Sequence, residues 1–169
     1  VANNLNDIAK NNPHIVISIA RQWKGISKET DAIIKHGCRT LLKQAHPEIL
    51  KYYRLDGTKN IKTTQFKILT PVVKTGTHLE FSFSVQNTRK KINTIRLEYA
   101  VYFLKQNGGF GKKVFKISES SFVAGEKAVV NKKQSFKPIT TRKFYPGKQK
   151  LAIVVNGKES NPLEFRLIV

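Results

Sequence analysis

The chain has 169 residues, which is enough for one ordinary domain or a small domain with an appendage. Its 31 Lys and Arg residues face 11 Asp and Glu residues, and the resulting net charge of +20 favours a polyanionic partner. The single Cys38 excludes an internal disulfide, and no apolar run is long enough to span a membrane. We therefore expect a protein of a reducing compartment, the cytoplasm. The start at Val1 and the lack of Met suggest part of a longer polypeptide.

Helical periodicity predicts the structure of the first third of the chain. Residues 1–10 are typical of the end of a helix, and Asn12 with Pro13 marks the start of the next one. The apolar face expected for that second helix is formed by Ile15, Val16, Ile19, Ala20 and Trp23. A longer helix is expected over residues 30–45 after Ser27, and Pro47 is expected to begin a short one.

A faint repeat indicates how these helices are organised. The strings "AKNNPHIV" (9–16) and "KQAHPEIL" (43–50) align at a spacing of 34 residues, which is a period found in paired-helix solenoids. We therefore expect residues 1–55 to be the terminal part of a longer array of HEAT-like repeats.

The period becomes two after residue 60, which predicts strands. The clearest example is "HLEFSFSVQN" (78–87), and Asn156-Gly157 predicts a tight hairpin near the end of the chain. About seven strands within the second part favour an immunoglobulin-like sandwich. The expected fold class is thus a two-part chain, with an α-helical HEAT-like repeat end over 1–55 and an all-β immunoglobulin-like sandwich over 56–169.

Catalytic and metal-binding patterns are largely missing from the sequence. The four His residues are scattered, and no zinc-ligand spacing is present. The string "GGFGKK" (108–113) lacks the Ser or Thr of a phosphate loop and joins two strands, which favours a basic hairpin. We predict neither a cofactor nor a metal, and we expect a monomer.

Basic side chains provide the candidate binding sites. On the predicted helix 30–45, His36, Arg39 and Lys43 are spaced three and four apart and share one ridge, which is either a solvated face or a set of phosphate donors. Further basic pairs lie in the predicted sandwich, at Arg89, Lys90, Lys91, Lys112, Lys113, Lys132, Lys133, Arg142 and Lys143. These form one patch if their loops gather at one end, and a diffuse halo if the loops are spread over both ends.

Four strings carry a resemblance to a known family. "VANNLNDIAKNNP", "IIKHGCRTLLKQAHPEIL", "YAVYFLKQNG" with "KVFKI", and "SFKPITTRKFYPGKQKL" resemble the carboxy-terminal part of the AlkC branch of HEAT-like-repeat DNA alkylation repair proteins. The likeness extends over nearly the whole chain, and the string at 135–151 is the most specific. The resemblance implies a monofunctional DNA glycosylase that removes cationic, N-alkylated bases and whose immunoglobulin-like domain helps to hold duplex DNA.

The resemblance also implies site residues. Asn4 and Asp7 belong to the first matched string and share a helix face. Asp7 is the candidate catalytic carboxylate, with an exposed structural role as the alternative. In the most specific string, Phe144 or Tyr145 is expected to anchor the loop, so that Thr140, Thr141, Arg142 and Lys143 can contact phosphates. Most of the catalytic pocket is expected in repeats upstream of this chain.

Two other functions stay open at this point. A non-enzymatic nucleic-acid-binding or scaffold module needs no catalytic pocket and fits the missing catalytic set. A cell-surface sandwich domain fits the strand pattern but not the charge. The preferred hypothesis joins the ridge at His36, Arg39 and Lys43 and the basic sandwich loops into one surface that holds duplex DNA.

Overall fold

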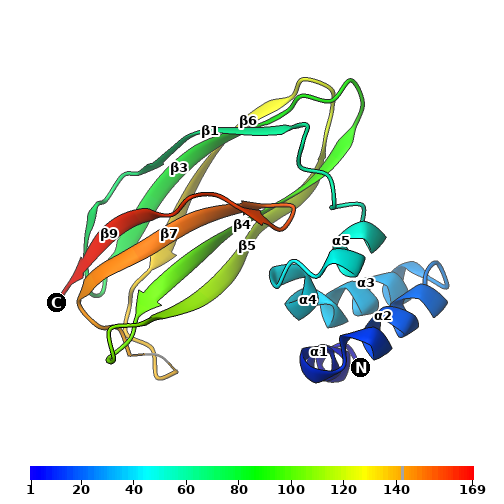
Figure 1. Cartoon of the computed structure of the whole chain (residues 1–169), viewed down its shortest axis with the longest axis horizontal. Coiled ribbons are helices and arrows are strands. Elements are labelled where there is room, and N and C mark those ends of the chain that lie inside the picture. The colour runs from blue at the N-terminus through cyan, green and yellow to red at the C-terminus, as the bar shows by residue number, and fades with distance from the viewer. Residues whose placement is uncertain (142) are drawn as a thin grey trace. The chain divides into compact units, whose positions relative to one another are not determined.

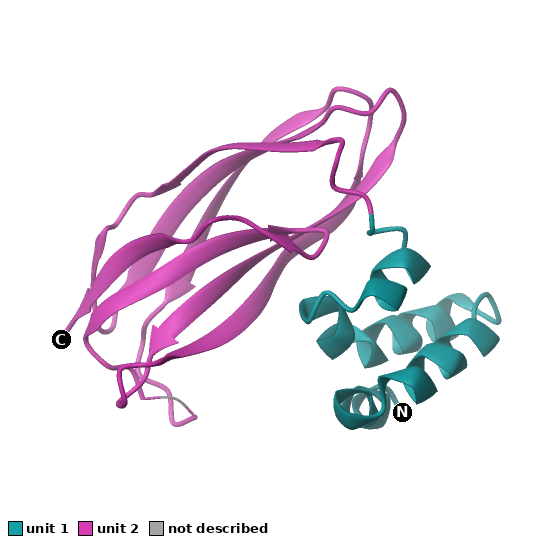
Figure 2. Ribbon diagram, viewed as in Figure 1, with its two compact units in different colours: residues 1–56 teal, residues 57–169 magenta. Residues whose placement is uncertain are grey.

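The computed structural model describes residues 1–141 and 143–169, and the chain forms two compact units, residues 1–56 and 57–169 (Figure 2). The first unit is helical. Its elements in chain order are α1 (Ala2–Asn11), α2 (Pro13–Gln22), α3 (Lys28–Gly37), α4 (Arg39–Lys43) and α5 (Pro47–Tyr52).

Local sequence explains where these helices begin. Pro13 and Pro47 occupy the first helical positions of α2 and α5, where the missing N–H of proline is harmless. Ser27 caps α3, since its hydroxyl oxygen accepts a hydrogen bond of 3.1 Å from the backbone N–H of Thr30. These starts agree with the sequence prediction.

The apolar face predicted for α2 is partly wrong. Val16, Ile17 and Ala20 are buried, whereas Ile15 and Trp23 are 42% and 38% exposed. The buried side chains pack in a cluster with Leu5 and with apolar residues of the later helices. The face that packs is thus rotated toward Ile17, because the packing of neighbouring helices selects one stripe from several apolar residues.

The predicted fold class is wrong in its helical half. The chain is mostly β, with 43% strand and 24% helix, and its described residues contain no long helical repeat part. The five helices of the described residues are 5 to 10 residues long. The helix expected over 30–45 is broken at Cys38, where α3 ends and α4 begins. Faint 34-residue spacing between two Pro-containing strings therefore did not indicate HEAT-like repeats.

The second unit consists of two β-sheets (Figure 1). Its strands are β1 (Ile61–Ile68), β2 (Val72–Lys74), β3 (His78–Asn87), β4 (Asn93–Leu104), β5 (Phe110–Phe122), β6 (Lys127–Ser135), β7 (Gly147–Val155), β8 (Lys158–Glu159) and β9 (Leu163–Ile168). One sheet has the order β1-β3-β6. The other has the order β2-β9-β7-β4-β5, with β8 paired to β7.

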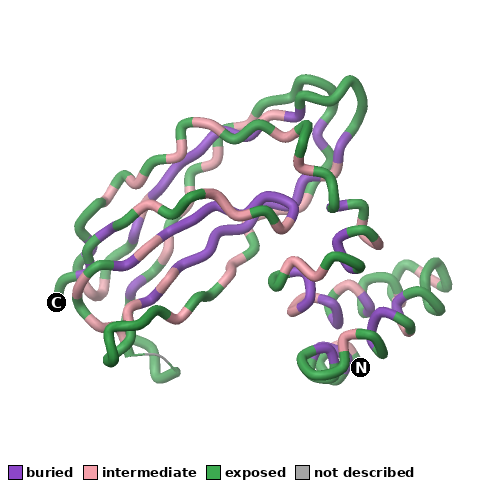
Figure 3. Tube along the Cα trace, in the orientation of Figure 1, coloured by how far each residue is buried: buried purple, intermediate pink, exposed green. Residues whose placement is uncertain are grey.

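The core of this unit is formed by inward-facing residues of both sheets. Alternate residues of β3, such as Phe81 and Phe83, pack with alternate residues of β4, such as Leu97 and Val101. The buried stretches of β3, β4 and β7 run through the interior (Figure 3). The strand expected over 78–87 is β3, because its strict alternation matches a sheet with one face in the core.

The last hairpin also agrees with its sequence prediction. Asn156 and Gly157 have φ angles of 47° and 78°, as a two-residue turn between β7 and β8 requires. The Asn156 side chain fixes this turn, since its Oδ1 accepts a hydrogen bond of 2.7 Å from the backbone N–H of Arg96. None of the helices in the described part of the chain is long and apolar enough to cross a membrane.

Candidate nucleic-acid interface

Three connections meet at one end of the sandwich, which we call the loop end: residues 75–77, 105–109 and the described residues of 136–146. The backbone N–H of Gly76 donates to the carbonyl of Phe136 at 3.0 Å, and the N–H of Phe136 donates to the carbonyl of Thr77 at 2.9 Å. The hydroxyl of Tyr145 donates to the side chain of Gln106 at 3.3 Å. The loop end is therefore a set of mutually bonded connections.

Phe136 anchors the longest of these connections. It is fully buried, and its ring lies 5.9 Å from Phe103, 5.2 Å from Phe144 and 5.6 Å from Phe165, between ring centroids. Phe144 packs beside it, as the sequence prediction for this string proposed. The main anchor, Phe136, was not predicted, although a lone Phe directly after a lysine-rich strand is a recognisable pattern.

A buried amide holds two of the connections together. Gln149 is 1% exposed, and its Oε1 accepts a hydrogen bond of 2.7 Å from the backbone N–H of Leu104. Its Nε2 donates to the carbonyl of Tyr145 at 2.9 Å. Because both groups of the amide are used, residues 105–109 and 136–146 are held in a fixed relation.

Hydrogen-bond donors project from this fixed frame. Thr140, Thr141 and Lys143 are exposed, and the Lys143 ammonium lies 5.4 Å from the ring centroid of Tyr145. Two exposed lysines of the same connections, Lys105 and Lys137, were not singled out from the sequence. The predicted site residue Arg142 lies outside the described residues. The loop end thus gathers ammonium and hydroxyl donors on connections that Phe136 and Gln149 hold, which suits contacts to a phosphate backbone.

Phe110 and the lysines of β5 lie next to the loop end. Phe110 is 38% exposed, and the Lys150 ammonium lies 5.1 Å from its ring centroid. Lys112 is paired with Glu159, to which Tyr102 also donates a hydrogen bond. Burial lowers the pKa of Lys112, but the hydrogen bond to Glu159 and its negative charge together raise the pKa by more than burial lowers it. The net pKa of Lys112 is therefore above its usual value. Lys112 therefore stays charged but is neutralised within the chain.

Lys113, the next residue of β5, contacts an aromatic ring. Its ammonium lies 5.7 Å from the ring centroid of Phe115, on the same edge strand. It is exposed, so its charge faces solvent beside the loop end.

The basic residues 89–91 lie at the other end of the sandwich. Arg89, Lys90 and Lys91 form the connection between β3 and β4, whereas the loop end follows β4 (Figure 1). The 12 residues of β4 separate the two ends by about 40 Å. Asn87 fixes this second connection through hydrogen bonds of 3.0 Å to the carbonyl of Lys91 and from the backbone N–H of Arg89. The basic turns do not form a single patch.

In the helical unit, His36 and Arg39 are in contact across the break between α3 and α4. The Arg39 guanidinium also donates to Oδ1 of Asn3 at 3.1 Å, so α1 takes part in the same surface. Lys43 is exposed at the end of α4. The structure thus brings the first two ridge residues together and adds Asn3, which was not predicted.

Asp7 lies on α1 near this surface and is solvent-exposed. Its carboxylate accepts a hydrogen bond of 2.7 Å from the Lys10 ammonium. That hydrogen bond and the charge of Lys10 lower the pKa of Asp7, and the charge of Arg39 lowers it slightly further. Asn4 is exposed on the same helix. Asp7 is thus an ionised carboxylate among cations, and its catalytic role stays a prediction.

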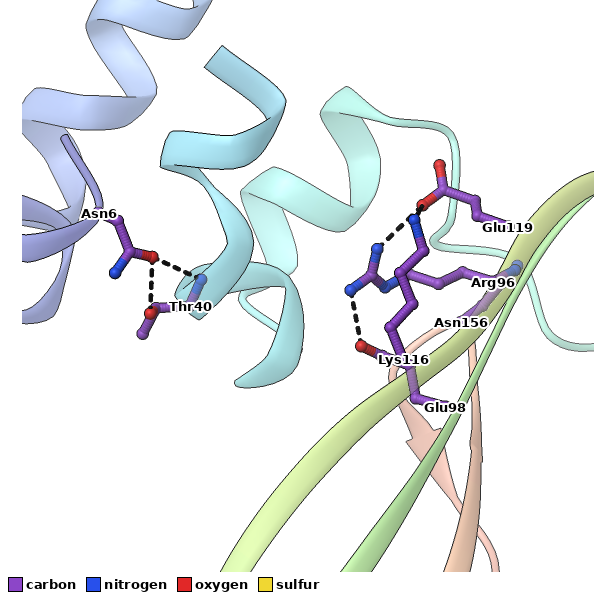
Figure 4. Close-up of polar contacts among 7 residues, drawn as sticks. All are labelled: Asn6, Thr40, Arg96, Glu98, Lys116, Glu119 and Asn156. Atoms are coloured by element: carbon purple, nitrogen blue, oxygen red, sulfur yellow. Dashed lines mark hydrogen bonds and ion pairs between the residues drawn. The ribbon is translucent and has the colours of Figure 1, made fainter. Parts of the chain in front are cut away.

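A buried ionic network in the sandwich was missed entirely. The Arg96 guanidinium pairs with Glu98 at 2.6 Å and with Glu119 at 2.9 Å, and Lys116 approaches Glu119 at 3.6 Å (Figure 4). The side chains of Arg96, Glu98 and Glu119 are 4%, 1% and 7% exposed. Charged residues that alternate with apolar ones on a strand predict a face in contact with solvent, so the sequence pattern predicted exposed side chains for Arg96 and Glu98.

The described residues contain no cluster of three or more His, Cys, Asp or Glu side chains that could hold a metal ion. The arrangement at the loop end and at the helical ridge offers hydrogen-bond donors and positive charge. Such groups bind and position an anion.

Comparisons with known proteins give the relatives of the chain. A family model described as "Uncharacterised protein YhaZ, C-terminal Ig-like domain" matches residues 62–169. The uncharacterized protein YhaZ of Bacillus subtilis (strain 168) is 38% identical over 167 residues, which cover 99% of this chain and 46% of that protein.

Solved structures extend the comparison. The chain is similar to the Pseudomonas fluorescens alkylpurine DNA glycosylase AlkC bound to DNA containing an abasic site analog. The TM-score is 0.91 and the identity 30%, over 99% of this chain and 47% of that one. A β-glucosidase from Erythrobacter marinus matches 64% of this chain and 15% of its own at 14% identity and a TM-score of 0.53, a likeness of fold alone. The chain spans about half the length of the first two relatives.

Proposed function

The chain belongs to the family of the YhaZ C-terminal Ig-like domain, and on this premise we propose that it is the DNA-binding carboxy-terminal portion of a DNA alkylation repair protein. The likeness to AlkC supports this proposal, since that glycosylase was solved bound to DNA and matches 99% of this chain. The net charge of +20 independently favours a polyanionic partner. The proposed partner is double-stranded DNA carrying alkylated bases, bound by a monomer in the cytoplasm.

The loop end is the observation that carries the DNA-binding part of the proposal. Its exposed donors, among them Thr140, Thr141 and Lys143, stand on connections held by Phe136 and Gln149. Because the connections are held at Phe136 and Gln149, contact with phosphates orders less backbone than a free loop would require. Such contacts position a protein on duplex DNA and are independent of base sequence.

The helical ridge is the second proposed contact. His36 and Arg39 are already held together, and Asn3 fixes the guanidinium of Arg39 from α1. We propose that this ridge, continued by Lys43, also contacts duplex DNA. The residues Arg89, Lys90 and Lys91 at the opposite end of the sandwich contribute to the long-range attraction of DNA and not to the loop-end contact.

The enzymatic part of the proposal is excision of N-alkylated bases by the complete protein. In such a reaction the bond between base and sugar breaks, its electron pair leaves with the cationic base, and positive charge develops on the sugar. Water then adds to the sugar as the new hydroxyl and releases one proton to solvent. A carboxylate near the sugar stabilises this charge, and Asp7 is the candidate within this chain. The other catalytic groups are proposed to lie in the half of the relatives that this chain does not span.

Base release tests this function. The complete gene product is incubated with duplex DNA that carries N-alkylated purines, and the free bases are quantified. We expect release by the complete protein, together with sequence-independent duplex binding by this chain. Binding without release would contradict the enzymatic part and leave a non-enzymatic nucleic-acid-binding or scaffold module. Absence of binding at moderate salt would contradict the proposal as a whole.

A further inference from the structure

The outer face of the sheet β1-β3-β6 contains a polar trough. Leu79, Phe81 and Phe83 of the central strand β3 point into the core, so Ser82 and Ser84 point outward. Although they face outward, Ser82 and Ser84 are only 6% and 2% exposed. Taller side chains of the two edge strands therefore stand above them and form the walls.

A groove of about 460 Å³ follows this trough, and its lining includes side chains of all three strands. Polar lining residues come from each of them: Gln65, Lys67, Ser82, Ser84 and Asn131. Val129, which is 66% exposed, is the apolar part of one wall. The edge strands and the central strand differ visibly in burial (Figure 3).

A β-bulge in β1 sets which side chains reach this face. The pairing with β3 shifts by one residue between Thr64 and Lys67, and Gln65 at the bulge has a φ of 57°. One extra residue reverses the alternation of a strand, so Phe66 packs against the core and Lys67 turns outward. The bulge is held by a hydrogen bond of 2.9 Å between the hydroxyl of Ser84 and Oε1 of Gln65.

Lysines rim the trough on both edge strands. Lys62 of β1 and Lys127 of β6 both pair in register with Gln86 of β3, and directly paired residues share a face. Two strand spacings place their Cα atoms about 10 Å apart. Lys67 pairs with Ser82, four residues farther along β3, or about 13 Å away.

Most of this charge is not neutralised within the chain. Lys133 on the same face is paired with Glu80 at 2.6 Å. Lys62, Lys67 and Lys127 are exposed and form no ion pair with any of residues 1–141 and 143–169. The outer face therefore presents three uncompensated ammonium groups around a floor of hydroxyl and amide groups.

We propose that this outer face is a second phosphate-binding surface, which holds the backbone of a DNA duplex through Lys62, Lys67 and Lys127. Hydroxyl, amide and ammonium groups are the side chains that contact phosphate and sugar. Among the outward positions of β1, β3 and β6, all within the described residues, the one ring is the imidazole of His78 at the start of β3. Phe66 and Phe83 also line the groove, but their side chains pack in the core. Stacking platforms for unpaired bases need aromatic rings, so the face suits a duplex backbone and not a single strand.

This surface is separate from the loop end, because it covers the face of one sheet and not its end connections. The inference rests on the proposed function only in taking DNA as the polyanion. It implies a longer contact with the duplex than the loop end alone provides, or contact with a second duplex segment. An acidic polypeptide is the competing partner and is tested below.

The test compares two triple variants of the chain that lose the same charge. Lys62→Gln, Lys67→Gln and Lys127→Gln alter the trough, and Lys28→Gln, Lys51→Gln and Lys59→Gln alter exposed lysines elsewhere. Binding to a mixed-sequence duplex is measured from low to moderate salt. The slope of log K against log salt is negative, and each lost phosphate contact reduces its magnitude by about 0.9. We therefore expect the magnitude to fall by about 2 to 3 in the trough variant and by clearly less in the control.

Equal slopes for the two triple variants would overturn the proposal. So would a trough variant that keeps the wild-type slope but self-associates in sedimentation, since the lysines would then only keep exposed strand edges apart. Binding of polyglutamate but not DNA, lost in the trough variant, would assign the surface to an acidic protein. If the trough variant has a shallower salt slope but the variant Lys105→Ala, Lys137→Ala and Lys143→Ala keeps the wild-type slope, the loop-end assignment is contradicted and the trough assignment is supported.

Discussion

The side-chain oxygen of Asn6 caps helix α4 from a different helix. Its Oδ1 accepts hydrogen bonds of 3.1 Å from the backbone N–H of Thr40 and 2.8 Å from the hydroxyl of Thr40, 34 residues along the chain (Figure 4). Asn6 is 3% exposed, so this cap is protected from water. It joins α1 to the break between α3 and α4 and thereby positions Arg39, which precedes Thr40.

Replacing the Asn6 cap will destabilise the helical unit. Asn6→Ala removes the acceptor of the partly buried N–H of Thr40, and loss of such a helix cap costs about 0.5–2 kcal/mol. We expect the amide of Thr40 to exchange with solvent faster and the unit to unfold at lower temperature. Asn4→Ala on the exposed side of the same helix is the matched control and changes stability by less than about 0.5 kcal/mol. Similar effects of both changes would contradict the capping role.

Removing one member of the buried ionic network will strongly lower the unfolding free energy of the sandwich, whereas replacing all three buried charges with apolar residues will lower it much less. Arg96→Met leaves Glu98 and Glu119 buried without their main partner, which costs about 3–5 kcal/mol in unfolding free energy. The triple change Arg96→Met, Glu98→Leu and Glu119→Leu removes all three charges, and we expect it to recover most of that loss. Urea unfolding measures both variants. A triple variant as unstable as the single one would argue against burial of unpaired charge as the cause.

The Asp7–Lys10 pair will be visible in a pH titration. The folded-state pKa of Asp7 is depressed, so the pair stabilises α1 above the ordinary pKa of 3.8 and this contribution is lost as the pH falls through the folded value. We expect the carboxyl resonance of Asp7 to titrate below 3.8, and Lys10→Ala to move the midpoint upward. An unchanged midpoint in Lys10→Ala would show that the pair is not formed in solution.

Replacing Gln149 will weaken DNA binding indirectly, because this side chain holds the loop-end connections in place. Gln149→Leu removes the acceptor of the Leu104 N–H and the donor to the Tyr145 carbonyl, at a cost of about 1–3 kcal/mol. We expect weaker DNA binding with little change in the salt slope, because the cations remain but their support is loosened. Gln149→Glu keeps the acceptor for the Leu104 N–H but places a buried carboxylate oxygen against the Tyr145 carbonyl, so we expect it to weaken DNA binding as well. Equal binding by all three proteins would remove Gln149 from the account.

Short-range patterns in the sequence predicted the parts of the structure that depend on neighbours along the chain. The alternation of residues 78–87 gave the strand β3, and Asn156-Gly157 predicted the hairpin, since both positions need a positive φ. Ser27 and Pro13 predicted helix starts, because a capping hydroxyl and a proline at the first helical position act on adjacent residues. These features are decided by residues within a few positions of one another.

Features that depend on distant residues were missed or wrong. The break at Cys38 lies beside a cap supplied by Asn6, so the periodicity of residues 30–45 could not reveal it and the HEAT-like prediction was wrong. Arg96 and Glu98 have the pattern of a solvated face but are buried. The division of the basic turns between two ends follows from strand order, which residue spacing does not contain.

The salt dependence of duplex binding by a loop-end variant tests the central claim most directly. In Lys105→Ala, Lys137→Ala and Lys143→Ala combined, all the exposed lysines changed belong to the loop end. If these residues contact phosphates, the negative slope of log K against log salt becomes shallower by about 2 to 3 than that of the unchanged chain. A slope equal to that of the charge-matched control at Lys28, Lys51 and Lys59 would contradict a DNA-binding loop end.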